Sequence, residues 1–200
     1  MGRLNDDPAE LRRRIAALEA ELRERTEEVG YYRLQLDILS TIDPVTGLLN
    51  RSGLVDSLDV ALHRLERQRE PFAVLAVRLA ILGELALQDN EAHEEALRHC
   101  SALLSAGLRA LDRNGRVDSS TFAVVLPLVI EADVPLVVGR LMSILTAAPL
   151  EVLGTEVDPD PRFSVVLVGS GQVAEIETVL DLVEQGLSEA TAERPSVKRI

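Results

Sequence analysis

The sequence feature that most constrains the fold is a short polar turn between two less polar segments, within residues 116–127. Arg116 and Val117 precede the turn, and an apolar run from Phe122 to Leu126 follows it. This pattern predicts a β-hairpin whose second strand is buried in a sheet. A turn at a sheet edge can present carboxylates and backbone N–H groups to a phosphate. Four residues form the predicted turn: Asp118, Ser119, Ser120 and Thr121.

Helical and extended patterns alternate along the chain from residue 52 onward, which indicates an α/β or α+β domain. The region 83–112 is expected to be helical, with two helical segments that meet near Asp89 and Asn90. The other predicted elements are a helix over 52–70, a strand over 72–79, a helix over 131–147, strands within 150–157 and 163–168, and a helix over 174–192. Residues 193–200 are expected to form a flexible tail.

Two motifs carry a resemblance to a known family. Arg116, Phe122 and Pro127 frame the hairpin in a way that resembles the signature hairpin of GGDEF domains, the diguanylate cyclase family, where Arg-x-Gly-Gly-Asp/Glu-Glu-Phe precedes an apolar strand. Residues 43–51, Asp-Pro-Val-Thr-Gly-Leu-Leu-Asn-Arg, resemble the opening motif of that family. The resemblance covers residues 43–192 and implies an α/β fold like that of nucleotidyl cyclases, with a mixed, mostly antiparallel sheet flanked by helices.

The opening motif is interpreted as a structural turn. Pro44 and Gly47 favour a tight turn that ends the preceding helix. Asp43 and Arg51 are expected to brace this turn, and Asn50 is expected to cap the next helix.

The chain departs from the family at the positions that carry its chemistry. In the family, aspartates that bind metal stand at the end of the strand corresponding to 72–79. Here no carboxylate occurs from Phe72 to Gly83, and Arg78 stands near the expected aspartate. Magnesium requires oxygen ligands, mostly carboxylates, and a guanidinium would repel it. We therefore predict a degenerate GGDEF domain that is not an enzyme, with no catalytic residue, no metal site and no cofactor.

A second site of the family lies before the hairpin. Arg109 and Asp112 form an Arg-x-x-Asp sequence at the spacing of the inhibitory site, which in the family binds the product, cyclic di-GMP. The resemblance implies Arg140, on the helix after the hairpin, as the third residue. Two guanidiniums offer paired donors for phosphate or a stacking face for guanine. The alternative is an exposed ion pair of little energetic value. Arg113 lies outside this set and is expected to contribute little to binding.

A heptad pattern over residues 8–40 predicts a parallel coiled-coil dimer formed by residues 1–42. Charges across the expected seam agree with this, because Arg14 of one helix would face Glu19 of the other. One polar residue, Arg25, interrupts the seam. The alternative is a single amphipathic helix packed on its own domain. The predicted seam residues are Leu11, Ile15, Leu18, Leu22, Val29, Tyr32, Leu36 and Leu39.

Composition excludes several partners. The formal net charge of -12 argues against nucleic acid and against insertion into an anionic membrane surface, both of which need clustered cations. No apolar leader follows the first residue, and the single cysteine cannot form an intrachain disulfide, so the sequence predicts a cytoplasmic protein.

Two functions remain open at this point. In the first, the protein is an inactive GGDEF signalling protein that binds cyclic di-GMP and is dimerised by its coil, with an unknown effector protein as partner. In the second, it is a dimeric interaction module, a scaffold or adaptor, without a ligand.

Overall fold

The computed structural model describes residues 8–147, 150–152, 155–169 and 175–200. Contacts divide the chain into two units, one ending at Ser40 and one spanning Thr41–Ile200. In the first unit the described element is the helix α1 (Pro8–Leu39), as predicted from the heptad pattern. All its described side chains, residues 12–30, are exposed in the single chain. Four of the predicted seam residues have side chains outside the described part: Leu11, Tyr32, Leu36 and Leu39.

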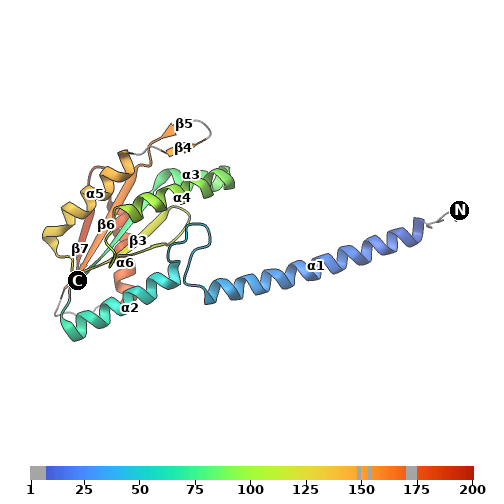
Figure 1. The fold of residues 1–200 in the computed structure, drawn as a ribbon, viewed down its shortest axis with the longest axis horizontal. Coiled ribbons are helices and arrows are strands. Elements are labelled where there is room, and N and C mark those ends of the chain that lie inside the picture. The colour runs from blue at the N-terminus through green and yellow to red at the C-terminus, as the bar shows by residue number, and fades with distance from the viewer. Residues whose placement is uncertain (1–7, 148–149, 153–154, 170–174) are drawn as a thin grey trace. The chain divides into compact units, whose positions relative to one another are not determined.

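The second unit is built on a five-stranded sheet (Figure 1). The strands are β1 (Phe72–Leu79), β2 (Arg113–Arg116), β3 (Thr121–Pro127), β6 (Pro161–Val168) and β7 (Ser196–Arg199). They follow the order β2-β3-β1-β6-β7, and all neighbours are antiparallel except β6 and β7. The expected mixed, mostly antiparallel sheet is therefore confirmed, and the predicted hairpin is the β2–β3 pair.

Helices cover both faces of this sheet (Figure 1). The helices are α2 (Arg51–Gln68), α3 (Ala80–Gln88), α4 (Asn90–Ala106), α5 (Val134–Ala147) and α6 (Ile176–Glu189). Side chains of β1 alternate between the two faces, as a strand requires. Leu75 and Val77 join the core with α3, α4 and α5, whereas Val74 and Ala76 join the core with α2 and α6. Two separate aliphatic cores therefore pack against the two faces of one sheet.

The predicted break between α3 and α4 is confirmed at Asp89. Its carboxylate accepts hydrogen bonds from the backbone N–H groups of Glu91 and Ala92, at 3.0 and 3.1 Å, and so caps α4. The region predicted as helix up to residue 112 ends earlier, at Ala106. The strand pattern over 150–157 forms a separate hairpin of β4 (Leu150–Val152) and β5 (Thr155–Val157), and the 3-10 turn η1 (Glu131–Asp133) precedes α5.

The predicted flexible tail at 193–200 is wrong. Residues Ser196–Arg199 form β7, which pairs in parallel with β6. The side chain of Lys198 also forms an ion pair with Glu189, with 2.8 Å between Nζ and the carboxylate. The backbone of β7 pairs with the edge of β6, a strand about 30 residues earlier in the chain. The sequence of residues 193–200 alone therefore does not predict this strand.

Helix α6 packs unusually close to β6 at Gly186. A Cβ atom added there would overlap Ser164 Oγ and would lie 3.0 Å from Ser164 Cβ. Ser164 is completely buried, and its hydroxyl has no hydrogen-bond partner within the described part of the chain. Glycine at this helix position therefore sets the distance between α6 and the sheet.

Candidate functional site

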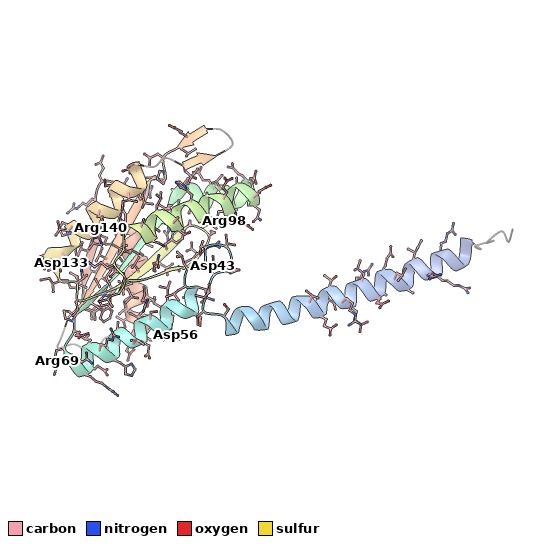
Figure 2. All side chains as sticks on the ribbon, viewed as in Figure 1. Asp43, Asp56, Arg69, Arg98, Asp133 and Arg140 are labelled. Atoms are coloured by element: carbon pink, nitrogen blue, oxygen red, sulfur yellow. The ribbon has the colours of Figure 1, made fainter. Side chains whose placement is uncertain are left out.

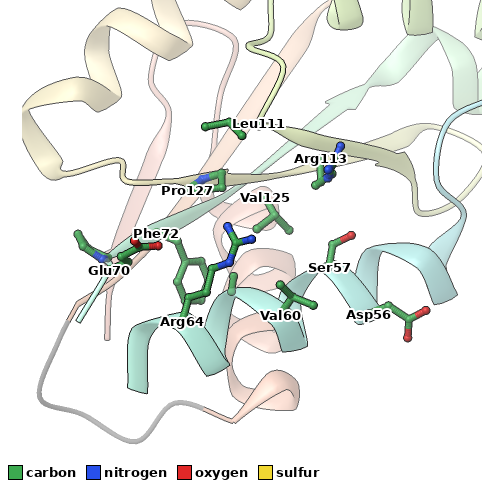
Figure 3. A pocket seen from close by; sticks show the side chains of 12 residues that line it. Asp56, Ser57, Val60, Arg64, Glu70, Phe72, Leu111, Arg113, Val125 and Pro127 are labelled. Carbon is green, nitrogen blue, oxygen red and sulfur yellow. The ribbon is translucent and has the colours of Figure 1, made fainter. Parts of the chain in front are cut away.

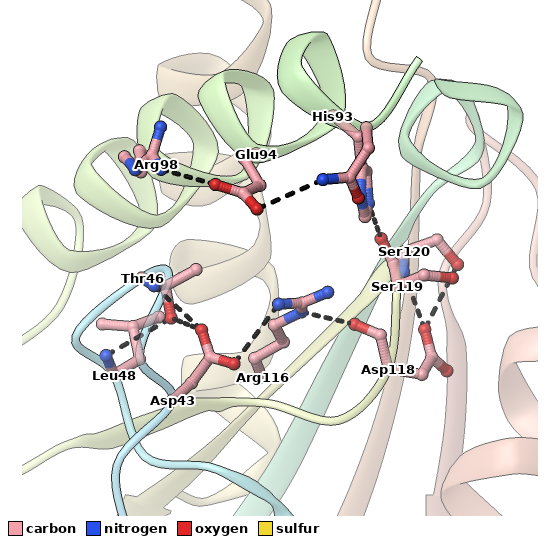
Figure 4. A network of polar contacts seen from close by, with 11 residues as sticks. Asp43, Thr46, Leu48, His93, Glu94, Arg98, Arg116, Asp118, Ser119 and Ser120 are labelled. Carbon is pink, nitrogen blue, oxygen red and sulfur yellow. Dashed lines mark hydrogen bonds and ion pairs between the residues drawn. The ribbon is translucent and has the colours of Figure 1, made fainter. Parts of the chain in front are cut away.

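The turn of the β2–β3 hairpin is shaped by its one acid. Asp118 Oδ1 accepts a hydrogen bond from the Ser120 backbone N–H at 2.8 Å, and the Ser120 hydroxyl lies 3.3 Å from the same oxygen (Figure 4). The Val117 N–H donates to the Thr121 carbonyl at 2.9 Å and closes the turn. The carboxylate of Asp118 thus stabilises the local backbone, in the manner of an Asx turn.

An ion pair ties this hairpin to the opening motif. Arg116 Nη1 lies 3.2 Å from Asp43 Oδ2, and both side chains are less than one-fifth exposed. Asp43 Oδ1 also accepts from the Thr46 N–H at 2.8 Å and from its hydroxyl at 2.7 Å (Figure 4). The sequence correctly predicted Asp43 as a brace, but its partner is Arg116 rather than Arg51. Asn50 caps α2 as predicted, because its side chain accepts from the Gly53 N–H at 3.0 Å.

His93 of α4 contacts the turn of the hairpin. Its Nε2 lies 2.8 Å from the Ser119 carbonyl oxygen, and the side chain is 5% exposed. A carbonyl oxygen can only accept, so Nε2 carries the proton in this contact. No sequence signal predicts a contact between residues 26 positions apart on a helix and a turn.

Arg78 faces the hairpin at the end of β1. It is the register partner of Thr121, and its Nε lies 3.4 Å from the Thr121 hydroxyl. A guanidinium therefore occupies the strand end where the resemblance implies metal-binding aspartates. Among the residues that the structure describes, no three His, Cys, Asp or Glu side chains are grouped so that they would hold a metal ion.

The structure joins two of the three predicted ligand-binding residues through the backbone. Asp112 Oδ2 accepts from the Arg109 N–H at 2.7 Å, and the Asp112 N–H donates to the Arg109 carbonyl at 3.0 Å. Asp112 is 8% exposed, so its carboxylate closes the turn after α4. The exposed guanidinium of Arg109 takes no part in this contact, and it forms no ion pair with any described residue.

Arg140, the third predicted residue, lies on the exposed side of α5 (Figure 2). Its guanidinium likewise has no ion-pair partner within the described ranges. The turn before Arg109 packs on the same helix, because a Cβ at Gly107 would lie 2.7 Å from Leu141 and 2.9 Å from Ile144. The structure thus brings the turn that leads to Arg109 against the part of α5 that follows Arg140.

A cavity of about 300 Å³ lies between α2 and the β2–β3 hairpin (Figure 3). Arg64 of α2 and Arg113 of β2 line it, and neither guanidinium forms an ion pair with a described residue. Leu111, which is 65% exposed, also lines this cavity, so the cavity adjoins the Arg109–Asp112 turn. Two acids, Asp56 and Glu70, are also present. The sequence placed Arg113 outside the predicted ligand-binding set and did not indicate Arg64.

The single cysteine offers no reactive thiol. Cys100 lies on the buried side of α4 and is 1% exposed, and burial raises the pKa of its thiol to about 12. The thiol therefore stays protonated at neutral pH, and the thiolate that would act as a nucleophile is not formed.

The sheet order, the two helical layers and the braced hairpin define a nucleotidyl cyclase-like α/β domain. Residues 40–195 match the family model described as diguanylate cyclase, GGDEF domain, and the chain belongs to the GGDEF family. The resemblance carried by the hairpin frame and the opening motif is thereby confirmed.

A curated relative is similar to the chain along most of its length. The chain is 25% identical over 193 residues to the response regulator PleD of Caulobacter vibrioides. The aligned region covers 93% of this chain but 41% of PleD. The chain therefore spans less than half the length of that relative.

Solved structures share the fold. The FimX GGDEF domain from Pseudomonas aeruginosa has a TM-score of 0.70 at 20% identity, with 80% of this chain and 99% of that chain covered. The coiled coil and GGDEF domain of DgcB from Caulobacter crescentus, solved in complex with c-di-GMP, has a TM-score of 0.64 at 18% identity and covers 92% and 100%.

Proposed function

We propose that this chain is a catalytically inactive GGDEF signalling protein that binds cyclic di-GMP and is dimerised by α1. The observation that carries the proposal is the set of guanidiniums around the turn after α4. Arg64, Arg109 and Arg113 have no ion-pair partners among the described residues, although the chain as a whole is strongly acidic.

The chemistry of the ligand fits these groups. Cyclic di-GMP carries two phosphates and two guanine rings, and guanidiniums both pair with phosphate oxygens and stack on flat rings. Asp112 acts here by shaping the turn, since its carboxylate accepts from the Arg109 backbone and is nearly buried. Arg109 and Arg140 supply the exposed cationic groups, and the cavity lined by Arg64 and Arg113 extends the same surface.

We expect cyclic di-GMP to bind the full chain, and Arg109→Ala to weaken that binding by about tenfold or more. The reason is that a hydrogen bond to a charged group contributes about 1.5–3 kcal/mol. Isothermal titration of the unaltered chain and of Arg109→Ala, Arg140→Ala and Arg64→Ala would measure the affinities. Arg162→Ala is the matched control, because Arg162 is exposed and already paired with Asp160 at 3.2 Å.

The binding proposal has a clear contrary outcome. If the unaltered chain does not bind at high micromolar ligand, or if Arg109→Ala binds as tightly as the unaltered chain, the turn is structural only.

We also expect no conversion of GTP to cyclic di-GMP. Phosphoryl transfer requires metal ions that bridge and neutralise the phosphates. Arg78 and Thr121 offer no carboxylate, and the one acid of the turn, Asp118, is held by Ser120. Incubation of the purified chain with GTP and magnesium, followed by chromatography, measures this. Formation of cyclic di-GMP above that of a heat-denatured sample would contradict the inactive assignment.

The second candidate is a dimeric interaction module without a ligand. The use of the Asp112 carboxylate within its own turn favours this alternative, because its Oδ2 already accepts from the Arg109 N–H and the side chain is nearly buried. The same titration separates the two functions, since a module of this kind would remain dimeric and bind no nucleotide.

A further inference from the structure

A second cavity, of about 290 Å³, lies on the face of the sheet that carries α2 and α6. Its walls come from Leu54 and Leu58 of α2 and from Val183 and Leu187 of α6, all of which belong to one aliphatic core. The residues of the turn after α4, Arg109 and Asp112, do not line it. It is therefore separate from the site proposed for cyclic di-GMP.

The cavity exists because its floor is made of small side chains. Ala76 of β1 and Ala123 of β3 are cross-strand partners on this face, and each contributes only a methyl group. On the opposite face, the neighbouring positions carry larger side chains, including Val77 and Phe122. The floor thus leaves room beneath the two helices that their leucines do not fill.

Polar groups gather at the hairpin end of this cavity. Arg51 lies at the start of α2, and Arg78 lies at the end of β1, next to the hairpin turn. The apolar residues Leu58 and Val74 line the cavity farther from this turn. The cavity therefore has an apolar body and a polar mouth. This arrangement is typical of sites for small amphipathic molecules.

Arg78 is the most buried of the charged side chains at this mouth, and it has no ion-pair partner among the described residues. Its side chain is half-buried, and its Nε lies 3.4 Å from the Thr121 hydroxyl, while no described residue accepts a hydrogen bond from its two terminal nitrogens. The acids that line the cavity, Asp118 and Glu184, are exposed and form no ion pair with either guanidinium. A partly buried cation without a partner is costly, and an anionic group would relieve that cost.

We propose that this cavity binds a medium-chain carboxylate, with the carboxylate head at Arg78 and Arg51 and the alkyl chain over Ala76 and Ala123. The size agrees with this class of ligand, since an apolar cavity of about 150 Å³ accommodates benzene. A volume near twice that value fits a chain of roughly eight carbons. The inference does not depend on cyclic di-GMP, because none of the arginines proposed to bind that ligand lines this cavity.

The test is titration of the full chain with octanoate, followed by calorimetry and by two-dimensional NMR. Octanoate is expected to bind, and three related compounds are expected to bind at least about tenfold more weakly. Butanoate has a shorter alkyl chain, 1-octanol has no charge, and octylammonium has a positive charge. Arg78→Met is expected to weaken octanoate binding by about tenfold or more, since it keeps the apolar stem and removes the cation.

A second variant tests the body of the cavity independently. Ala76→Leu fills the floor and is expected to abolish octanoate binding. Val183→Phe serves the same purpose from α6 if Ala76→Leu does not fold. Ala102→Leu, an exposed position on α4, is the matched control and is expected to bind normally.

Absence of octanoate binding at millimolar concentration would overturn the proposal. Equal binding by the unaltered chain, Arg78→Met and the cavity-filling variant would overturn it as well, because it would place the ligand elsewhere.

Discussion

Replacing both Leu18 and Leu22 with glutamate is expected to leave this protein monomeric, whereas the unaltered chain is expected to sediment as a dimer at micromolar concentration. Ile15, Leu18, Leu22 and Val29 are 50–68% exposed in the single chain and recur at heptad spacing on α1. Apolar side chains in such a row indicate a partner surface. Glutamates at two seam positions would bring unpaired carboxylates into the interface, at a cost of several kcal/mol for each ion.

The control for this experiment adds the same charge outside the seam. Ala17→Glu with Ala20→Glu lies on the opposite side of the heptad and is expected to sediment as a dimer. Sedimentation velocity of the three proteins decides the matter. A monomeric unaltered chain would show that α1 has another role.

Substituting alanine for Gly186 is expected to lower the free energy of unfolding by about 3 kcal/mol, at the upper end of the usual cost of overpacking. The added methyl group would overlap the Ser164 hydroxyl, which is buried between α6 and β6. Urea unfolding followed by circular dichroism would measure the change. A loss below about 0.5 kcal/mol would mean that α6 moves freely away from the sheet.

Two further variants make this stability experiment specific. Gly139→Ala is the matched control, because Gly139 lies within α5 with no atom within 4 Å of an added Cβ, so alanine there is expected to stabilise the helix by about 1 kcal/mol. Adding Ser164→Ala to Gly186→Ala removes the overlapping hydroxyl and is expected to recover part of the lost stability.

Local signals in the sequence predicted much of the fold. Apolar runs predicted β1 and β3, the polar turn predicted the hairpin, and Asp89 marked the junction of α3 and α4. These elements are visible because each depends on neighbours within a few residues. The strand β7 depends instead on the open edge of β6, which no local pattern reveals.

The candidate site was predictable only in part, for the same reason. Arg109 and Asp112 are close in sequence, so their shared turn was within reach of spacing arguments, although the use of the Asp112 carboxylate was not. The contacts of His93 with Ser119 and of Arg116 with Asp43 join residues 26 and 73 positions apart. Such contacts follow from packing of the whole domain.

The backbone of the hairpin turn is held by groups that lie outside the turn. All four of its carbonyl oxygens accept hydrogen bonds: Asp118 from Arg116, Ser119 from His93, Ser120 from Leu79, and Thr121 from Val117. These four contacts hold the main chain from the strands and from α4, and they do not require particular side chains within the turn. Apart from Asp118, whose carboxylate also holds the Ser120 N–H, the turn is therefore a position where side chains can be exchanged while the backbone path stays fixed.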